Sequence, residues 1–497
     1  MLGNAYTSVI NGIDAVSVKV EADISAGFPC FDITGNLGVA VRESRERVRM
    51  AIKNSGIRIV PARMIVNISP ADLRKEGTHY DLAVAVAVLQ AAGIIRQNLC
   101  ENIMFIGELG LNGELRPVRG VLPMVINWCK GGRQMVVLPR ENAMEASYVK
   151  DAKIIPASTL NEVIECIKGD FTEVPFENAK PLQSTEYGMD FADIHGQLSL
   201  KRAIMVAAAS MHNMLMIGPP GAGKTMAAER IPPMTYEQQL ELSGIYSVAG
   251  MLKDGVSFVD KRCFRAPHHC ITPQAMAGGG NGLMPGEVSL ACHGVLFMDE
   301  FNLFSTKTVE VLRQPMESGH ILIDRVNGKV EYPADFMLVA AMNPCKCGYY
   351  PDRNRCSCTP AQVRAYFGRL SRPLLDRIDV CVQVPRIKYE DMVYDGKDLY
   401  TNEYMRSTVE RVFNIQKERF ADEKYSLNSA IPAADVSRYC ILDREAENLM
   451  NSIYDSCDLS ARGYHKLLKV ARTIADIDGS EYIMAEHICE ASGYRMV

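Results

Sequence analysis

The chain has 497 residues, more than one hydrophobic core usually organises, so we expect two or three domains. Hydrophobic residues make up 47% of it and charged residues 23%, a balance that excludes a largely disordered protein. The formal net charge of −5 excludes a uniformly basic protein that coats nucleic acid, so any nucleic-acid site has to be local.

The N-terminus and the cysteines indicate a cytoplasmic protein. The first residues, Met1 to Tyr6, show no basic region followed by an apolar run, and the longest apolar stretch, Leu82 to Ile95, is too short to span a bilayer. Fifteen cysteines are scattered along the chain without an export signal, so most should be reduced thiols. We therefore expect a cytoplasmic protein with no membrane partner.

Residues 1–170 alternate short strand patterns with helical patterns, which predicts an α/β domain. The strand patterns are Ser17 to Val20, Met64 to Ile68, Ile103 to Ile106 and Gln134 to Leu138, and the helical patterns are Val41 to Asn54 and Asp81 to Ala92. Residues 171–189 carry two prolines and no clear periodicity, so they should form a linker.

A glycine-rich loop follows an apolar strand in a second α/β unit, which should span residues 190–389. The strand is Met214 to Ile217, and the loop matches G-x-x-x-x-G-K-[ST] with Gly218, Pro219, Pro220, Gly221, Ala222, Gly223, Lys224 and Thr225. Backbone N–H groups in such a loop converge on phosphate oxygens, and the next helix adds positive charge from its N-terminus. We expect Lys224 to reach the β and γ phosphates of ATP and Thr225 to ligate Mg²⁺.

A second motif, the apolar run Val295 to Met298, ends in Asp299 and Glu300. We expect a buried strand beside the P-loop strand that brings Asp299 to Mg²⁺, with Glu300 polarising the attacking water. Alone, such a run marks only the end of a strand, but its position downstream of a P-loop favours the catalytic role. The chain lacks the Asn-Lys-x-Asp sequence that reads guanine, which disfavours a GTPase.

Two short strands are predicted within Gly319 to Pro333, because Asn327 and Gly328 form a strong hairpin turn signal. A further apolar run, Phe336 to Met342, ends in Asn343. His268 and His269 are adjacent rather than spaced for one metal ion, so we expect them to be structural.

Four cysteines form two C-x-C pairs in a polar insertion, residues 345–358: Cys345, Cys347, Cys356 and Cys358. Four thiolates suit tetrahedral zinc, although the pairs are tighter than the usual C-x₂₋₄-C. Reduced structural cysteines and a redox pair are the alternatives. After Pro385 the strand signals fade, and Thr401 to Phe420, Arg444 to Tyr454 and Ala461 to Asp478 predict a small helical domain over residues 390–497.

Around these motifs the sequence resembles the magnesium-chelatase-like AAA+ family known as YifB or ComM, over essentially the whole chain. The matching stretches are Phe191 to Ile194, Gly196 to Gln197, Phe264 to His269, Pro285 to Ala291, Val311 to Glu317 and Ala340 to Pro344. The resemblance implies an α/β AAA+ core with a parallel sheet and a C-terminal helical lid.

The resemblance also implies roles for residues outside the P-loop. Asn343 should be sensor 1, Arg377 the arginine finger that completes the neighbouring subunit's site, and Arg462 the sensor 2 residue of the lid, with Arg372 as a rival for the finger. Residue type alone leaves a loop asparagine and solvated helix arginines equally open. A finger acting on a neighbour requires a ring, so we expect a homo-hexamer.

In family terms the hairpin before sensor 1 lines a central pore, so Arg325 and Lys329 are expected to grip a phosphate backbone. An exposed hairpin with ordinary solvated charges is the alternative.

Residues 64–123 resemble the proteolytic domain of Lon proteases, which implies a Lon-like fold for residues 1–170. Aligning Lys75 to Gly77 with the Lon pattern places His79 where the nucleophilic serine belongs, and aligning Val118 to Gly120 places Leu122 where the lysine belongs. Leucine has no proton to exchange, and histidine without a base cannot replace an activated hydroxyl. We expect no peptidase activity.

Two functions remain open at this stage. The favoured one is a ring motor that hydrolyses ATP to move on single-stranded or branched DNA, and by family resemblance drives branch migration in recombination during natural transformation, with recombination proteins as partners. The alternative is a chelatase-type or protein-remodelling ATPase. The chain shows no acidic metal-binding domain and no recognisable porphyrin pocket, so a chelatase role requires a partner protein.

Overall fold

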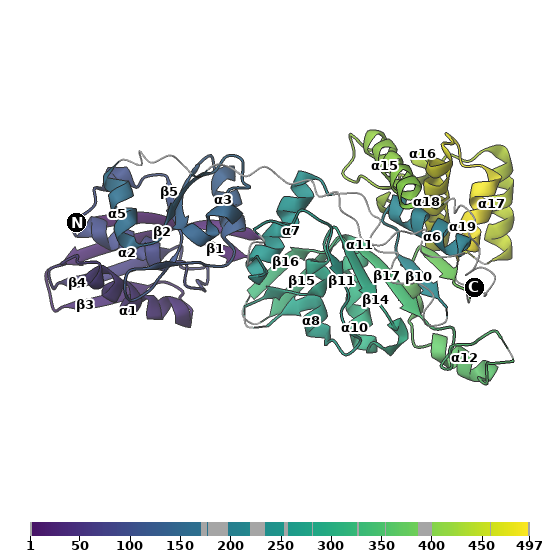
Figure 1. Cartoon of the computed structure of the whole chain (residues 1–497), viewed down its shortest axis with the longest axis horizontal. Coiled ribbons are helices and arrows are strands. Elements are labelled where there is room, and N and C mark those ends of the chain that lie inside the picture. The colour runs from purple at the N-terminus through teal and green to yellow at the C-terminus, as the bar shows by residue number, and fades with distance from the viewer. Residues whose placement is uncertain are drawn as a thin grey trace.

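A computed structural model describes residues 2–169, 176, 197–218, 234–252, 257–280, 282–325, 328–352, 354–385, 400–457 and 459–495. An N-terminal α/β unit, a central unit with a parallel sheet and a C-terminal group of helices follow one another along the long axis (Figure 1). The expected α/β fold with a helical C-terminal region is therefore confirmed. Among the described helices, none is both long and apolar enough to cross a membrane.

The N-terminal unit is built on a seven-stranded sheet in the order β3-β4-β2-β1-β5-β8-β9. Its strands are β1 (Leu2–Asn11), β2 (Asp14–Ser25), β3 (Cys30–Thr34), β4 (Arg63–Ser69), β5 (Ile103–Phe105), β8 (Met135–Pro139) and β9 (Lys153–Ala157), with the small pair β6 (Glu108–Leu109) and β7 (Leu115–Arg116) beside it. All four predicted strands are present. The sequence did not predict β1, because the polar Thr7 and Ser8 interrupt its apolar alternation although both are buried.

Helices pack on this sheet, and both predicted helical segments are confirmed. They are α1 (Val39–Asn54), α2 (Asp81–Ala91), α3 (Val121–Lys130), α4 (Ala143–Ala146) and α5 (Leu160–Lys168), with short 3₁₀ turns at Gln97–Leu99 and Arg140–Asn142. Every residue of α2 is buried, including Asp81 at its start. The Asp81 carboxylate is held by Ser44 Oγ at 2.5 Å and Arg47 Nε at 2.7 Å, which satisfies a charge that burial would otherwise make costly.

The central unit has a five-stranded sheet in the order β11-β14-β17-β10-β18, and its strand pairs are all parallel. The strands are β10 (Met214–Ile217), β11 (Phe264–Arg265), β14 (Val295–Met298), β17 (Met337–Met342) and β18 (Val380–Gln383). The expectation that the Asp299 strand lies beside the P-loop strand is wrong. β17, which ends at Asn343, lies between β14 and β10. Both flanking strands are continuous apolar runs, and such runs carry no information about strand order.

Short helices and two hairpins complete the central unit. The helices are α6 (Leu198–Ala209), α7 (Tyr236–Ala249), α8 (Pro273–Ala277), α9 (Glu287–Leu290), α10 (Thr306–Glu310), α11 (Pro315–Ser318), α12 (Pro360–Phe367) and α13 (Arg372–Leu375), with 3₁₀ turns at Phe301–Leu303 and Val311–Arg313. The hairpins are β12 (Gly278–Gly279) with β13 (Met284–Pro285), and β15 (His320–Arg325) with β16 (Gly328–Pro333). The hairpin predicted over Gly319 to Pro333 is confirmed.

The C-terminal helices share a core with α6, which precedes the P-loop strand in sequence. They are α15 (Asn402–Arg419), α16 (Val436–Tyr439), α17 (Arg444–Ser456), α18 (Ala461–Asp478) and α19 (Ala485–Gly493), with a 3₁₀ turn at Asn428–Ala430. Figure 1 shows α6 among these helices, and Arg202 on α6 pairs with Glu490 at 2.9 Å and Asp478 at 3.0 Å. The C-terminal helices are therefore anchored to α6, the helix that precedes β10 and the predicted P-loop.

The N-terminal unit packs against α7 of the central unit through a buried carboxylate, Glu145. Its oxygens accept hydrogen bonds from the Leu122 N–H at 3.2 Å, the Asn142 side-chain amide at 3.3 Å and the Ser247 hydroxyl on α7. Burial raises the pKa of Glu145, and these donors oppose the shift. The α7 helix thus supplies one of the hydrogen-bond donors that offset the cost of burying the Glu145 carboxylate.

Replacing Glu145 with glutamine is expected to change how stability depends on pH. The pKa of Glu145 is raised above that of an unfolded glutamate, about 4.3, so the folded chain keeps a proton that the unfolded chain has released. Glu145 therefore stabilises the folded chain at lower pH. This contribution to the free energy of unfolding is lost as pH rises from the unfolded-state pKa through the raised folded-state pKa, by about 1.4 kcal/mol per pH unit between the two pKa values.

The glutamine variant lacks this loss, so its melting temperature relative to the wild type should increase as pH rises from about 4 to about 8. Scanning calorimetry over that range measures the difference. The melting temperature of Glu141→Gln, a change at an exposed neighbouring position, should change with pH as that of the wild type does. If the melting temperature of Glu145→Gln also changes with pH as that of the wild type does, the prediction is wrong.

Candidate active site

The described residues of the predicted nucleotide site lie at one edge of the parallel sheet, where its strands end. Ile217 pairs with Met342, and Met298 pairs with Ala340, so Gly218, Asp299 and Asn343 follow strands that end together. The Gly218 N–H donates to the Met342 carbonyl at 3.0 Å. The carboxyl edge of a parallel sheet is where open α/β folds bind their ligands. The rest of the predicted loop, Pro219 to Thr225, lies outside the described residues.

Asp299 and Glu300 leave β14 as exposed carboxylates. Glu300 has a left-handed backbone (φ 50°, ψ 44°), and its N–H donates to Asp299 Oδ1 at 2.8 Å. A left-handed conformation at a non-glycine residue costs energy and is concentrated at functional sites. Asp299 and Glu300 are therefore joined by a strained turn at the end of β14, where one residue for a metal ion and one for a water molecule are expected.

His269 lies beside Glu300, a contact that the sequence did not predict. Its Nδ1 is 3.5 Å from Glu300 Oε2. Adjacency to His268 favoured a structural role, but β11 ends at Arg265, next to β14, and the segment after β11 therefore reaches the end of β14. In the sequence, the one indication of a role for His269 is that it belongs to the matching stretch Phe264 to His269. Its contact with Glu300 becomes apparent only from the order of the strands in the sheet.

Arg377 and Arg462 converge on one carboxylate, Glu317, which ends up beside both although it is 60 residues from the first and 145 from the second. Arg377 Nη2 donates to Glu317 Oε2, and Arg462 Nη2 donates to Glu317 Oε1 at 3.3 Å. The pKa of Glu317 is lowered mainly by the hydrogen bond from Arg377. Glu317 lies in a matching stretch, Val311 to Glu317, but sequence reasoning gave it no role.

The two arginines differ in exposure. The Arg377 side chain is 9% exposed and also donates to the Pro373 carbonyl at 2.5 Å, whereas the Arg462 side chain is 46% exposed. Lys466 on α18 donates to the Ile378 carbonyl at 2.7 Å, so the lid is tied to the segment that carries Arg377. Arg372, the rival finger, is exposed at the start of α13.

The predicted pore residues Arg325 and Lys329 lie at the tip of the β15–β16 hairpin, and both are exposed. Asp324, also exposed, is paired with Lys329 in the register, so the tip carries mixed charge. The β12–β13 hairpin lies beside this one, since the Tyr332 hydroxyl donates to the Leu283 carbonyl at 2.9 Å.

This close approach needs glycine at position 278. The φ of Gly278 is 100°, and a Cβ there would lie 2.8 Å from Ile323 Cδ1 of the neighbouring strand.

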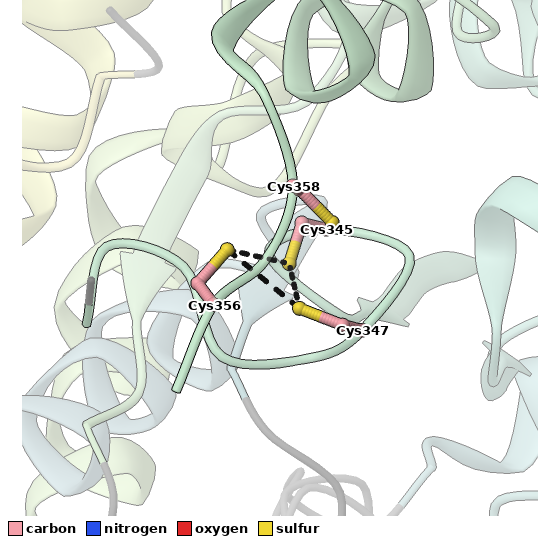
Figure 2. A group of neighbouring side chains, drawn as sticks. All are labelled: Cys345, Cys347, Cys356 and Cys358. Carbon is pink, nitrogen blue, oxygen red and sulfur yellow. Dashed lines mark hydrogen bonds between the residues drawn. The ribbon is translucent and has the colours of Figure 1, made fainter. Parts of the chain in front are cut away.

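The four cysteines of residues 345–358 come together in the loop between β17 and α12. Cys345 Sγ lies 3.3 Å from Cys347 Sγ and 3.8 Å from Cys356 Sγ, and the last two are 3.6 Å apart. Each of the four sulfur atoms, that of Cys358 included, lies within 4.8 Å of the others (Figure 2).

The residues at the Lon-like catalytic positions are buried and engaged in structural contacts. His79 Nε2 is 2.8 Å from the Ser8 carbonyl oxygen, and burial lowers the pKa of His79 to about 4. Leu122 is fully buried, and its N–H approaches the Ser247 hydroxyl of α7 at 3.4 Å. The position corresponding to the Lon lysine therefore lies in the contact with the central unit.

Comparison with known proteins identifies related sequences over all three units. The family described as magnesium chelatase, subunit ChlI, matches residues 190–392, subunit ChlI of Mg-chelatase matches residues 20–142, and its C-terminal family matches residues 400–495. Competence protein ComM of Haemophilus influenzae is 38% identical over 99% of this chain and 97% of its own length.

Two further relatives differ in extent. YifB of Escherichia coli is 36% identical over 100% of this chain and 97% of its own length. A Lon protease of Trichlorobacter lovleyi is 25% identical over 35% of this chain and 23% of its own length.

Proposed function

The chain belongs to the magnesium-chelatase-like AAA+ family that includes ComM and YifB, and from this we propose that it is a ring-shaped motor that hydrolyses ATP to move on DNA. The family implies an ATPase that uses ATP and Mg²⁺. As the family resemblance implies, the DNA would be single-stranded or branched, and the work would be branch migration in recombination.

For hydrolysis, we assign the roles of Lys224 and Thr225 by the loop motif and those of Asp299, Glu300 and Asn343 by position at the sheet edge. Lys224 would contact the β and γ phosphates, and Asn343 would orient the water that Glu300 activates. Mg²⁺, held by Thr225 and Asp299, would neutralise charge on the phosphates. The exposed carboxylate of Asp299, at the same edge of the sheet as Gly218, is a suitable oxygen donor for that ion.

The shared carboxylate of Glu317 supports a paired action of Arg377 and Arg462. Two guanidinium groups on one carboxylate form an arrangement that also suits a phosphate, because Arg pairs with both anions through the same planar donors. We propose a homo-hexamer in which Arg377 exchanges Glu317 for the γ-phosphate of a neighbour's ATP.

The observation that carries the DNA proposal is the exposed hairpin tip with Arg325 and Lys329 beside a second, glycine-rich hairpin. Such tips, repeated around a ring, would present positive charge to a phosphate backbone.

Changing Arg325 and Lys329 together to alanine is expected to abolish the stimulation of ATP hydrolysis by single-stranded DNA while basal hydrolysis persists. Removing two phosphate contacts per subunit should also reduce the salt dependence of DNA binding by about two units of log–log slope for each engaged subunit. ATPase assays with and without DNA, and binding titrations at several salt concentrations, measure both effects.

The matched control is the double change Arg49→Ala and Lys53→Ala, two exposed basic residues on α1, which belongs to the N-terminal unit and not to the central unit that carries the hairpin (Figure 1). It should keep full stimulation. Equal loss in both double variants would count against a hairpin-specific contact.

The tip carries mixed charge, because Asp324 is paired with Lys329, and this supports a second candidate function. A chelatase-type or protein-remodelling motor would grip a polypeptide rather than a phosphate chain. ATP hydrolysis indifferent to every DNA form, with a partner protein that co-purifies in fixed ratio, would favour that candidate.

A further inference from the structure

The loop between β17 and α12 brings together four thiols that the ATPase chemistry does not use. Cys345 and Cys356 are buried, and Cys347 is half-buried. Cys345, Cys356 and Val363 form the centre of a small buried cluster, against which Cys347, Cys358, Tyr350 and Phe367 pack. This cluster of thiols in so small an apolar centre indicates a role other than hydrogen bonding, because each buried S–H is only a weak hydrogen-bonding group.

The sulfur positions fit a tetrahedral metal ion. Zinc binds thiolate sulfur at about 2.3 Å, so four sulfur atoms around one ion lie about 3.8 Å apart. The three measured separations, from 3.3 to 3.8 Å, are close to that value. A disulfide would instead require about 2.0 Å, and each cysteine of this loop is a free thiol.

Backbone N–H groups hold the loop around the sulfur atoms, and one of them donates to a sulfur atom. The Tyr350 N–H donates to Cys345 Sγ at 3.4 Å, and the Gly348 N–H closes the turn onto the Cys345 carbonyl at 3.0 Å. Gly348 has a φ of 83°, a conformation that favours glycine. On the other side of the loop, the Cys356 N–H donates to the Asp352 carbonyl at 2.7 Å.

We propose that Cys345, Cys347, Cys356 and Cys358 bind one structural Zn²⁺ ion. Four protein ligands leave no position open for water, so the ion holds the loop rather than taking part in catalysis. The loop joins Asn343 at the end of β17 to α12 and then to α13, which precedes Arg377. The ion therefore fixes the connection between two residues expected to act on opposite sides of a subunit.

The test is the metal content of the full chain, purified under reducing conditions and measured by plasma mass spectrometry. We expect about one zinc ion per chain. The double change Cys347→Ser and Cys358→Ser should remove it, whereas Cys457→Ser with Cys489→Ser, at exposed cysteines of the C-terminal region, should retain it. Any of three results would overturn the proposal. They are a wild-type chain that remains zinc-free after dialysis against zinc, a wild-type chain that carries iron instead, and a loop double variant that keeps zinc.

Three further measurements keep the test decisive if the serine variant folds poorly. Replacing zinc with cobalt should give the ligand-field absorption of a tetrahedral thiolate site, and its absence in cobalt-loaded wild type would also reject the site. Cys358→His, which keeps a zinc ligand, should retain the metal. Chelation should speed amide hydrogen exchange in residues 344–352 but not in α18, and equal exchange in both states would contradict a role in holding the loop.

Discussion

Glu300→Gln lowers the turnover number for ATP by about 10²–10⁴-fold, the range expected when a general base is removed, while nucleotide affinity stays nearly unchanged. Glutamine keeps the size of the side chain and removes the carboxylate that accepts the proton from water. Because Glu300 is exposed and contacts Asp299 through its backbone N–H, the substitution should leave the local fold intact.

Steady-state hydrolysis and a nucleotide-binding titration on the same preparation separate the two effects. Glu445→Gln, an exposed acid on α17, should behave as the wild type. Lys224→Ala should instead weaken binding itself. A Glu300→Gln chain that retains most of its turnover, or that no longer binds ATP, would remove Glu300 from the role of base.

Arg377→Ala should lower turnover by about 10³–10⁵-fold, the contribution of an arginine finger. The guanidinium would act on the ATP of a neighbouring subunit, so mixing Arg377→Ala chains with Glu300→Gln chains should restore part of the activity. In the mixed ring, a subunit with intact Glu300 can receive Arg377 from its neighbour, although each variant alone is inactive. Hydrolysis measured across mixing ratios, with oligomer size followed by light scattering, tests this.

Arg372→Ala is the matched control, because it lies five residues earlier in the same segment and is exposed. It should keep most of the activity. A larger loss in Arg372→Ala than in Arg377→Ala would move the finger to Arg372. Mixed rings that assemble and stay inactive would show that Arg377 serves its own chain, where Glu317 already holds it beside Arg462.

The sequence anticipated the elements that carry the site more reliably than their neighbours. Val295 to Met298 was recognised as a buried strand because all its residues are apolar, and all are buried. The same uniformity gives no indication of which strands pair with it, because a continuous apolar run is compatible with any position inside a parallel sheet. The insertion of β17 between β14 and β10 was for that reason not foreseen.

Contacts between distant residues were beyond the sequence for a related reason. Glu317, Arg377 and Arg462 belong to α11, the segment after α13 and α18, and no spacing rule links them. The same holds for Ser247 on α7, which reaches Glu145 in the N-terminal unit. His269 was recognised as part of a matching stretch, but its approach to Glu300 follows from the pairing of β11 with β14.

The sequence by itself determined the type of most elements, the family and the residues of the nucleotide motif, because periodicity, turn residues and motif spacing are local properties of the chain. Only the tertiary structure decided the order of the parallel strands, the carboxylate shared by two arginines and the meeting of four thiols. These depend on how separate hydrophobic cores pack, and packing brings together residues whose distance along the chain says nothing about their distance in space.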